Sequence, residues 1–119
     1  HLIDAKAIET MKPGAVIINT ARGKLIDSDA LIAGLESGKL GGAALDVLEN
    51  ENGLYYYNRM GDVIPNPELA ALRSMPNVIL TDHTAFYTEE DVESMVRGVL
   101  ESADAFAKGQ PTRHDVTNL

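Results

Sequence analysis

The chain has 119 residues, with 18 acidic and 10 basic side chains, a formal net charge of −8 and no cysteine. This length allows one domain with a modest core, and the negative charge argues against binding to nucleic acid or anionic membranes. Without cysteine there is no disulfide framework, and no apolar stretch approaches the ~20 residues of a membrane span, so we expect a cytoplasmic protein.

The first predicted elements are a helix and a buried strand. Residues 4–11 place apolar side chains at helical spacing, and Asp4 can cap the first turn. After a turn at residues 12–14, residues 15–19 form an apolar run that is rich in β-branched side chains and too short for a helix. Such a run is typical of a strand buried on both faces, as in parallel sheets.

The second helix is predicted to start after the cap residue Asp27 and to end at Gly38, with Leu40 continuing its apolar spacing. Residues 41–47 are mostly small and predict a strand that another element approaches closely. Residues 49–67 form a polar and aromatic connection of a length that is usually functional or mobile. The order of elements up to this point is therefore helix, strand, helix, strand.

A short helix at residues 67–73 and a third strand at residues 78–80 follow. Thr88 is placed to cap the longest predicted helix, whose apolar stripe continues to Phe106 and which ends at Gly109. Alternating strands and helices predict an α/β fold with a parallel sheet and right-handed crossovers. Three strands leave an apolar edge unpaired, so we expect the rest of the sheet to lie outside these residues.

Four polar residues follow the predicted strands: Arg22 after the first, Asp46 and Glu51 after the second, and His83 after the third. In open α/β sheets, ligands bind beyond the carboxyl ends of the strands. Arg22 offers a planar fork that can hold a carboxylate, and His83 is the kind of side chain that exchanges a proton near neutral pH. With Glu51 they suit proton transfer at an oxygen while a hydride moves at the adjacent carbon.

Each of these residues also has a purely structural interpretation. Arg22 could be bound to Asp27 or Asp29 in the first turn of the following helix, and His83 could be a surface or hydrogen-bonded structural residue. Glu51 could simply be solvated in its polar loop. No metal site is predicted, because the three histidines of the chain lack any ligand spacing such as His-x-x-x-His.

Three stretches together resemble a known family: MKPGAVIINTARG, SGKLGGAALDVLENE and PNVILTDHTAFYTEE. Their order and spacing resemble the second half of the nucleotide-binding domain of NAD-dependent D-2-hydroxyacid dehydrogenases. HTAFYT and the tyrosine-bearing loop resemble the D-lactate dehydrogenase branch. The resemblance implies the C-terminal half of a doubly wound, Rossmann-type parallel-sheet domain over residues 1–108. Residues 109–119 would then be a tail returning toward a substrate domain outside this chain.

The resemblance also implies the chemistry. Arg22 of INTARG would hold and polarise the keto acid, Glu51 of ENE would pair with the catalytic histidine, and His83 of HTA would be the proton donor. The implied reaction is reduction of a 2-keto acid by NADH to a D-2-hydroxy acid. The full-length protein would be a homodimer, and this partial chain alone would be inactive.

Further contacts follow from the same resemblance. The cofactor-binding residues would be Thr20, Ala21 and Arg22 beside the nicotinamide ribose and Asp46 at the nicotinamide carboxamide. Phe86 and Tyr87 would wall the substrate pocket.

Two departures from the family pattern qualify this interpretation. Asp82 stands where the family usually has proline, next to His83, where it could act on the histidine or face solvent. The chain also lacks the G-x-G-x-x-G motif and the acidic residue that binds the adenosine ribose, which we expect upstream of His1. The choice between NAD and NADP therefore lies outside this chain. Pyruvate, phenylpyruvate and branched-chain keto acids remain alternative substrates.

Two other functions compete with the enzyme. The chain could be a non-catalytic interaction module, or a truncated remnant of this fold that pairs its open sheet edge with another chain. It could also be an NAD-sensing corepressor, as some relatives of the family are. Retention of Arg22, Glu51 and His83 together favours the enzyme.

Overall fold

The computed structural model describes residues 1–112, which fall into two compact units, His1–Ala85 and a second unit that begins at Phe86. The predicted boundary after residue 108 stays a prediction. Most of the predicted tail at residues 109–119 lies outside the described residues.

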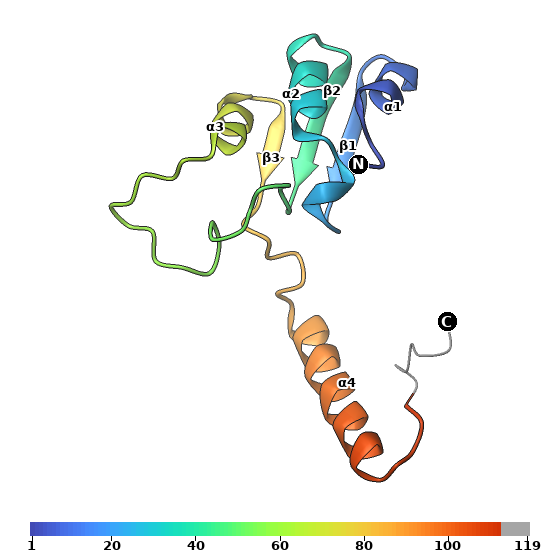
Figure 1. The fold of residues 1–119 in the computed structure, drawn as a ribbon. Coiled ribbons are helices and arrows are strands. Elements are labelled where there is room, and N and C mark those ends of the chain that lie inside the picture. Colours follow the sequence, from blue (N-terminus) through green and yellow to red (C-terminus); the bar gives the residue numbers. More distant parts are fainter. Residues whose placement is uncertain (113–119) are drawn as a thin grey trace. The chain divides into compact units, whose positions relative to one another are not determined.

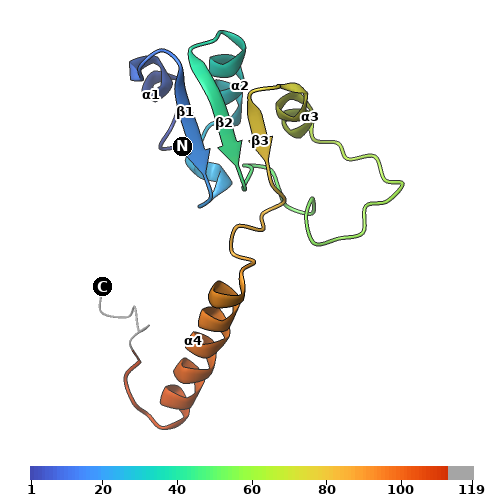
Figure 2. The same ribbon diagram turned by 180° about the vertical axis from the view of Figure 1, so that it is seen from behind.

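The first unit is a three-stranded parallel sheet with helices, in the strand order β1-β2-β3 (Figure 1). Its elements are α1 (Ala5–Thr10), β1 (Ala15–Asn19), the 3₁₀ helix η1 (Gly23–Leu25), α2 (Ser28–Glu36), β2 (Leu40–Leu45), α3 (Pro67–Ser74) and β3 (Val78–Leu80). The arrowheads of all three strands point to the same edge (Figure 2). The predicted α/β fold with a parallel sheet is confirmed, and the loops that follow the strands meet at one edge.

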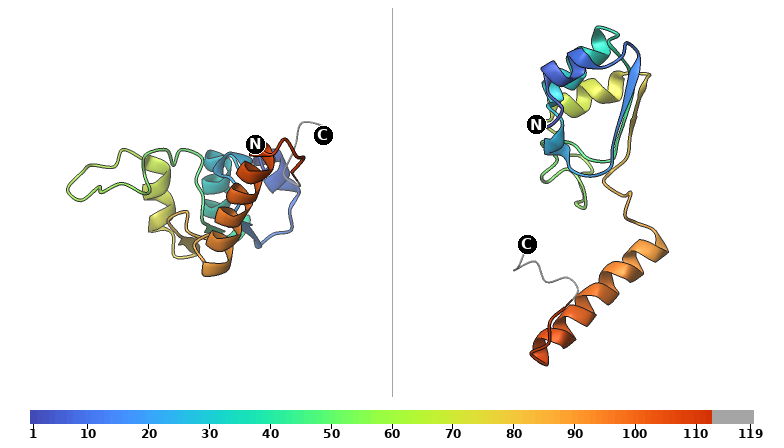
Figure 3. Two further views of the ribbon diagram at one scale, coloured as in Figure 1. Left: turned by 90° about the horizontal axis from the view of Figure 1, so that it is seen from below. Right: turned by 90° about the vertical axis from the view of Figure 1, so that its right-hand side faces the viewer.

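The helices of the first unit lie on one face of its sheet (Figure 3). The core between them is built from apolar side chains: Ile8, Ile17, Ile26, Leu31, Leu35, Leu40, Ala43, Leu45, Leu48, Leu69 and Leu72. On the other face Val16, Ile18 and Ile79 are 62%, 72% and 67% exposed, and Ile18 and Ile79 flank Ala44 in the strand register. The prediction that β1 is buried on both faces is therefore wrong for this unit, because its helices cover only one face.

Side-chain caps set the starts of the helices. The carboxylates of Asp4 and Asp27 accept hydrogen bonds from the N–H groups of Ala7 and Ala30, at 2.8 and 3.0 Å. Asn66 accepts from the N–H of Leu69 in the same way and is followed by a proline at the first helical position.

The end of α2 corrects one predicted boundary. Gly38 has φ +72°, a left-handed conformation that suits glycine just beyond a helix end. Leu40 is therefore not a continuation of the helical spacing but the first residue of β2, where it is 1% exposed. The predicted close approach to the small residues of β2 is confirmed at Gly41, where a Cβ would lie 2.5 Å from the carbonyl oxygen of Gly14.

The second unit consists mainly of α4 (Glu89–Ala107), as its apolar stripe and acidic first turn predict. The hydroxyl of Thr88 caps it by accepting from the N–H of Asp91 at 3.1 Å. Several large apolar side chains of α4 are exposed within the unit: Met95, Val96, Val99, Leu100 and Phe106. Among the described residues, no helix is both long and apolar enough to span a membrane.

Candidate active site

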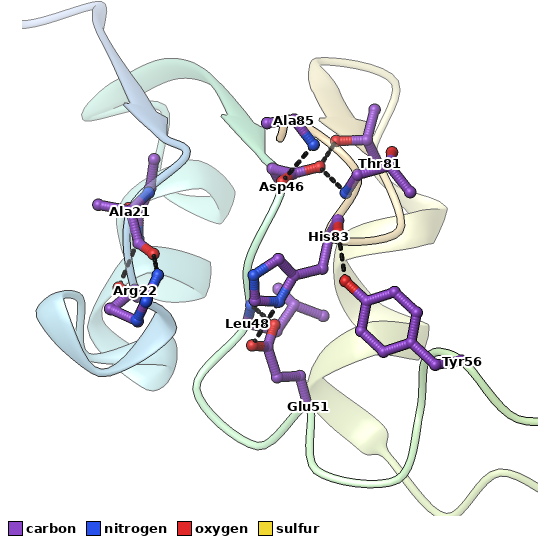
Figure 4. Close-up of polar contacts among 11 residues, drawn as sticks. Ala21, Arg22, Asp46, Leu48, Glu51, Tyr56, Thr81, His83 and Ala85 are labelled. Atoms are coloured by element: carbon purple, nitrogen blue, oxygen red, sulfur yellow. Dashed lines mark hydrogen bonds and ion pairs between the residues drawn. The ribbon is translucent and has the colours of Figure 1, made fainter. Parts of the chain in front are cut away.

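Asp46, the residue that follows β2, fastens the turn that carries His83 (Figure 4). Its side chain is buried, with the residue only 4% exposed. One carboxylate oxygen accepts from the Thr81 hydroxyl at 2.5 Å and from the N–H of Thr84 at 2.9 Å. The other accepts from the N–H of Ala85 at 2.9 Å. A carboxylate that follows one strand thus fixes the loop after the neighbouring strand.

These bonds also set the charge of Asp46. Burial raises the pKa of its carboxyl, whereas the hydrogen bond from Thr81 lowers that pKa. The N–H groups of Ala85 and Thr84 and the charge of the neighbouring His83 lower the pKa further, and the net result is below the ordinary value of 3.8. Asp46 is therefore ionised at neutral pH, which makes it a stronger acceptor for the three donors that hold the turn.

Glu51 and His83, predicted as partners, are in direct contact. The imidazole Nδ1 of His83 lies 2.9 Å from Oε1 of Glu51, and both side chains are largely buried. The second oxygen of Glu51 accepts from the N–H of Leu48 at 2.8 Å, so both oxygens of the carboxylate are held. Nδ1 is the ring nitrogen in contact with Glu51, so Nε2 is the ring nitrogen outside this contact.

Arg22 is exposed, and its guanidinium is turned back onto its own loop, where it donates to the carbonyl oxygen of Ala21 at 2.6 Å. Within residues 1–112, no carboxylate lies within ion-pair distance of it, so neither Asp27 nor Asp29 binds it. The alternative of an arginine tied to the next helix is thus not what the structure shows. The structure brings Glu51 and His83 together, but not Arg22 with either of them.

Asn19, the last residue of β1, shapes the exposed loop that carries Arg22. It is 6% exposed, and its side-chain oxygen accepts from the N–H of Ala21 at 3.1 Å. Its side-chain amide donates to the carbonyl oxygen of Arg22 at 3.0 Å. Sequence reasoning missed this residue, although a polar side chain at the end of an otherwise apolar strand is a usable signal.

Gly23 brings the Arg22 loop into contact with the loop that carries Glu51. A Cβ at Gly23 would lie 2.0 Å from the carbonyl oxygen of Leu48, so only glycine allows this approach. The N–H of the same Leu48 donates to Glu51. Leu48 therefore contacts Gly23 of the Arg22 loop through its carbonyl group and Glu51 through its N–H group. Sequence reasoning did not find this contact, which joins residues far apart in the chain.

Comparison with known proteins identifies the family. Residues 1–85 match the family model described as "D-isomer specific 2-hydroxyacid dehydrogenase, NAD binding domain". The chain belongs to this family. The predictions of family and of a Rossmann-type NAD-binding fold are thereby confirmed.

Individual proteins of this family are similar to the chain in sequence and in structure. An aromatic 2-oxoacid reductase from Clostridium sporogenes is 49% identical over 106 residues, which are 89% of this chain and 32% of that protein. A D-lactate dehydrogenase from Treponema pallidum superimposes with a TM-score of 0.87 at 39% identity, covering 98% of this chain and 35% of that one. The NAD-complexed D-isomer specific 2-hydroxyacid dehydrogenase from Lactobacillus delbrueckii gives a TM-score of 0.85 at 38% identity, covering 94% and 34%. The chain thus spans about a third of the length of these relatives.

The residues present fit one end of the family's cofactor. Thr20 and Ala21 are exposed on the loop after β1, at the edge of the sheet where ligands bind in such folds. Asp46 keeps spare acceptor capacity, because a carboxylate offers about four lone-pair sites and three donors reach it from within the chain. The 119 residues contain no glycine-rich phosphate loop, so they suit the nicotinamide end only.

Three residues named from the sequence remain: Asp82, Phe86 and Tyr87. The side chain of Asp82 is 68% exposed and lies 3.7 Å from Arg73, so it points to solvent and a surface cation. Phe86 and Tyr87 belong to the second unit, and their role as walls of the substrate pocket stays a prediction. No group of three or more metal-ligating side chains occurs in the described part of the chain.

Proposed function

We propose that the full-length protein is an NAD-dependent D-2-hydroxyacid dehydrogenase of the D-lactate dehydrogenase type, which reduces a 2-keto acid to a D-2-hydroxy acid. One observation carries this proposal. In a domain of an NAD-binding family, a histidine and a glutamate from separate loops are in contact at 2.9 Å beyond the carboxyl ends of the strands. Such a pair suits a general acid for a carbonyl oxygen.

In this mechanism NADH, when bound, supplies the hydride that reaches the carbonyl carbon. His83 donates a proton from Nε2 to the carbonyl oxygen as that oxygen gains negative charge, and Glu51 stabilises the imidazolium before the transfer. The product is the hydroxyl group, and the neutral imidazole is reprotonated from solvent. In the reverse direction His83 takes the proton from the hydroxyl.

Arg22 is proposed to bind the substrate carboxylate with both arms of its guanidinium. It must first leave the carbonyl oxygen of Ala21, which costs little because the guanidinium is exposed and can exchange that bond for water. The charge would also stabilise the developing alkoxide. Thr20 and Ala21 are proposed to line the ribose beside the nicotinamide, and Asp46 to accept from its carboxamide.

The cytoplasmic location and the homodimer are also proposals. Both rest on the family to which the chain belongs. Sedimentation of the full-length protein tests the dimer directly: the mass of a single chain across the working concentration range would exclude it.

The experiment that tests the function is an NADH oxidation assay of the full-length protein. Pyruvate, phenylpyruvate and a branched-chain keto acid are compared, and the products are separated on a chiral column. We expect turnover with at least one keto acid and only the D-product. Absence of turnover with all three, or an L-product, would contradict the proposal.

A further inference from the structure

Tyr56 reaches the His83 turn from the long loop between β2 and α3 (Figure 4). Its hydroxyl donates to the backbone carbonyl oxygen of His83 at 2.5 Å, and the two rings are 6.2 Å apart between centroids. Tyr56 and His83 have φ of 67° and 54°, and no other non-glycine residue of the described chain has positive φ. Left-handed backbone is costly for residues other than glycine and needs support from its surroundings.

Tyr56 and Glu51 belong to one loop, which is internally braced. The N–H of Leu54 donates to the carbonyl oxygen of Glu51 at 2.9 Å, and Leu54 packs against the core. Nε of Arg59 donates to the carbonyl oxygen of Gly53, also at 2.9 Å. The loop therefore holds His83 at two points: Glu51 at the imidazole and Tyr56 at the backbone.

The peptide unit between His83 and Thr84 is bonded at both of its polar ends. Its carbonyl oxygen accepts from Tyr56, and its N–H donates to the buried carboxylate of Asp46. A peptide unit is planar, so two bonds on opposite sides fix its rotation and with it the direction in which the His83 side chain leaves the backbone.

We propose that Tyr56 is a positioning residue for proton transfer, which keeps the imidazole of His83 on Glu51 by fixing this peptide unit. The inference rests on the proposed function. Loss of the hydroxyl removes the Tyr56 hydrogen bond from a peptide unit in a strained conformation, so the turn relaxes and the imidazole leaves its place on Glu51. Tyr56 acts through His83 and needs no contact with the substrate.

The test compares Tyr56→Phe with Tyr57→Phe in the full-length protein. Tyr57 is a matched control, because it loses the same hydroxyl from the neighbouring position and is as exposed as Tyr56, 69% against 68%. For Tyr56→Phe we expect kcat to fall about fivefold to tenfold, the range that loss of one neutral hydrogen bond gives, with KM for NADH and keto acid unchanged. Tyr57→Phe should match the wild type. Equal kcat values for Tyr56→Phe and the wild type would overturn the proposal.

A double variant separates positioning from a general loss of structure. In the Glu51→Gln background the imidazole has already lost its charged partner, so Tyr56→Phe should reduce kcat little further. If Tyr56 merely stabilised the loop, the same fold loss would appear in both backgrounds, and that result would overturn the proposal.

An activity-independent measurement keeps this inference distinct from the proposed function. The ring proton signals of His83 in the NMR spectrum should shift in Tyr56→Phe and stay in place in Tyr57→Phe. A wild-type protein without turnover would contradict the proposed function. The NMR comparison alone would then decide whether Tyr56 positions His83. Unmoved signals in Tyr56→Phe would show that Tyr56 does not position His83.

Discussion

The His83 turn follows β3 and the Arg22 loop follows β1 at the same edge of the sheet, yet the fold holds their side chains very differently. The His83 turn is fastened by a buried carboxylate with three donors, and its imidazole lies on Glu51. The guanidinium of Arg22 is exposed and bonded only to the carbonyl oxygen of the preceding residue among the described contacts. Contacts within the chain thus hold the proposed proton-transfer pair in place, whereas we propose that the carboxylate-binding group is positioned by the substrate.

The contrast concerns side chains and not backbones. The side chain of Asn19 holds the backbone of the Arg22 loop, and Gly23 seats that loop against Leu48. With its backbone held and its guanidinium exposed, Arg22 can turn toward a substrate without disturbing the contact between His83 and Glu51. The predictions below test this division.

The largest effect is expected for His83→Asn in the full-length protein. Removing a general acid typically costs about 10²- to 10⁴-fold in rate, so kcat should fall by that factor. NADH affinity, measured by fluorescence titration, should stay unchanged because His83 is proposed to act on the substrate oxygen. A loss of kcat smaller than tenfold would show that another group supplies the proton.

Arg22→Lys should be the next most damaging change. The ammonium keeps the charge but lacks the fork, so kcat/KM for the keto acid should fall about 10²-fold. The free energy of unfolding should change by less than about 0.5 kcal/mol, because the side chain is exposed. Lys24→Ala, which removes an exposed cation two residues away, is the control and should retain wild-type kcat/KM. A clear loss of stability in Arg22→Lys would contradict the view that its side chain is loosely held.

Thr81→Val tests the hydrogen bond between Thr81 and Asp46 through the pH dependence of stability. The lost hydrogen bond to a carboxylate should lower the free energy of unfolding by about 1.5–3 kcal/mol at neutral pH. The pKa of Asp46 is depressed in the folded state, so its stabilisation is complete above 3.8 and is lost as the pH falls through the folded-state pKa. The difference in the free energy of unfolding between wild type and variant, measured by urea unfolding, should therefore become smaller at acidic pH. A gap independent of pH would mean that the bond does not act through the ionised carboxylate.

Asp82→Asn should have the smallest effect. An ion pair between exposed side chains contributes about 0–1 kcal/mol, and the Asp82 carboxylate points toward Arg73 at the surface. We expect kcat and its pH profile to overlay those of the wild type within about twofold. A displaced pH profile would instead give Asp82 a part in tuning the proton transfer.

Much of the fold follows from local sequence. The β-branched run of residues 15–19 and the caps Asp4, Asp27 and Thr88 each predict an element that the structure contains. These signals are local, because they depend on side-chain volume, branching and hydrogen bonds within one turn. Burial is not local. The apolar side chains of Val16 and Ile18 predict a covered face, but the elements that would cover it are absent from the first unit.

The candidate site also has a part that the sequence predicted and a part that it did not. Residue type and position after a strand made Glu51 and His83 candidates, because parallel strands bring their carboxyl ends to one edge, and the family resemblance paired them. The supporting contacts of Thr81 and Tyr56 were not predictable, since each depends on how one segment meets another in three dimensions. The contacts of Asn19 are local, and the sequence carried a usable signal for them. Sequence patterns thus point to the reacting groups more readily than to the residues that hold them.

The most direct measurement is a crystal structure of the full-length protein with NADH and a non-reactive 2-keto-acid analogue. We expect the Arg22 guanidinium to have left the carbonyl oxygen of Ala21 and to bind the analogue's carboxylate at roughly 2.7–3.2 Å. The contact between His83 and Glu51 should be unchanged, with Nε2 facing the analogue's carbonyl oxygen. A carboxylate bound elsewhere while Arg22 stays on Ala21, or a rebuilt His83 turn, would contradict this expectation.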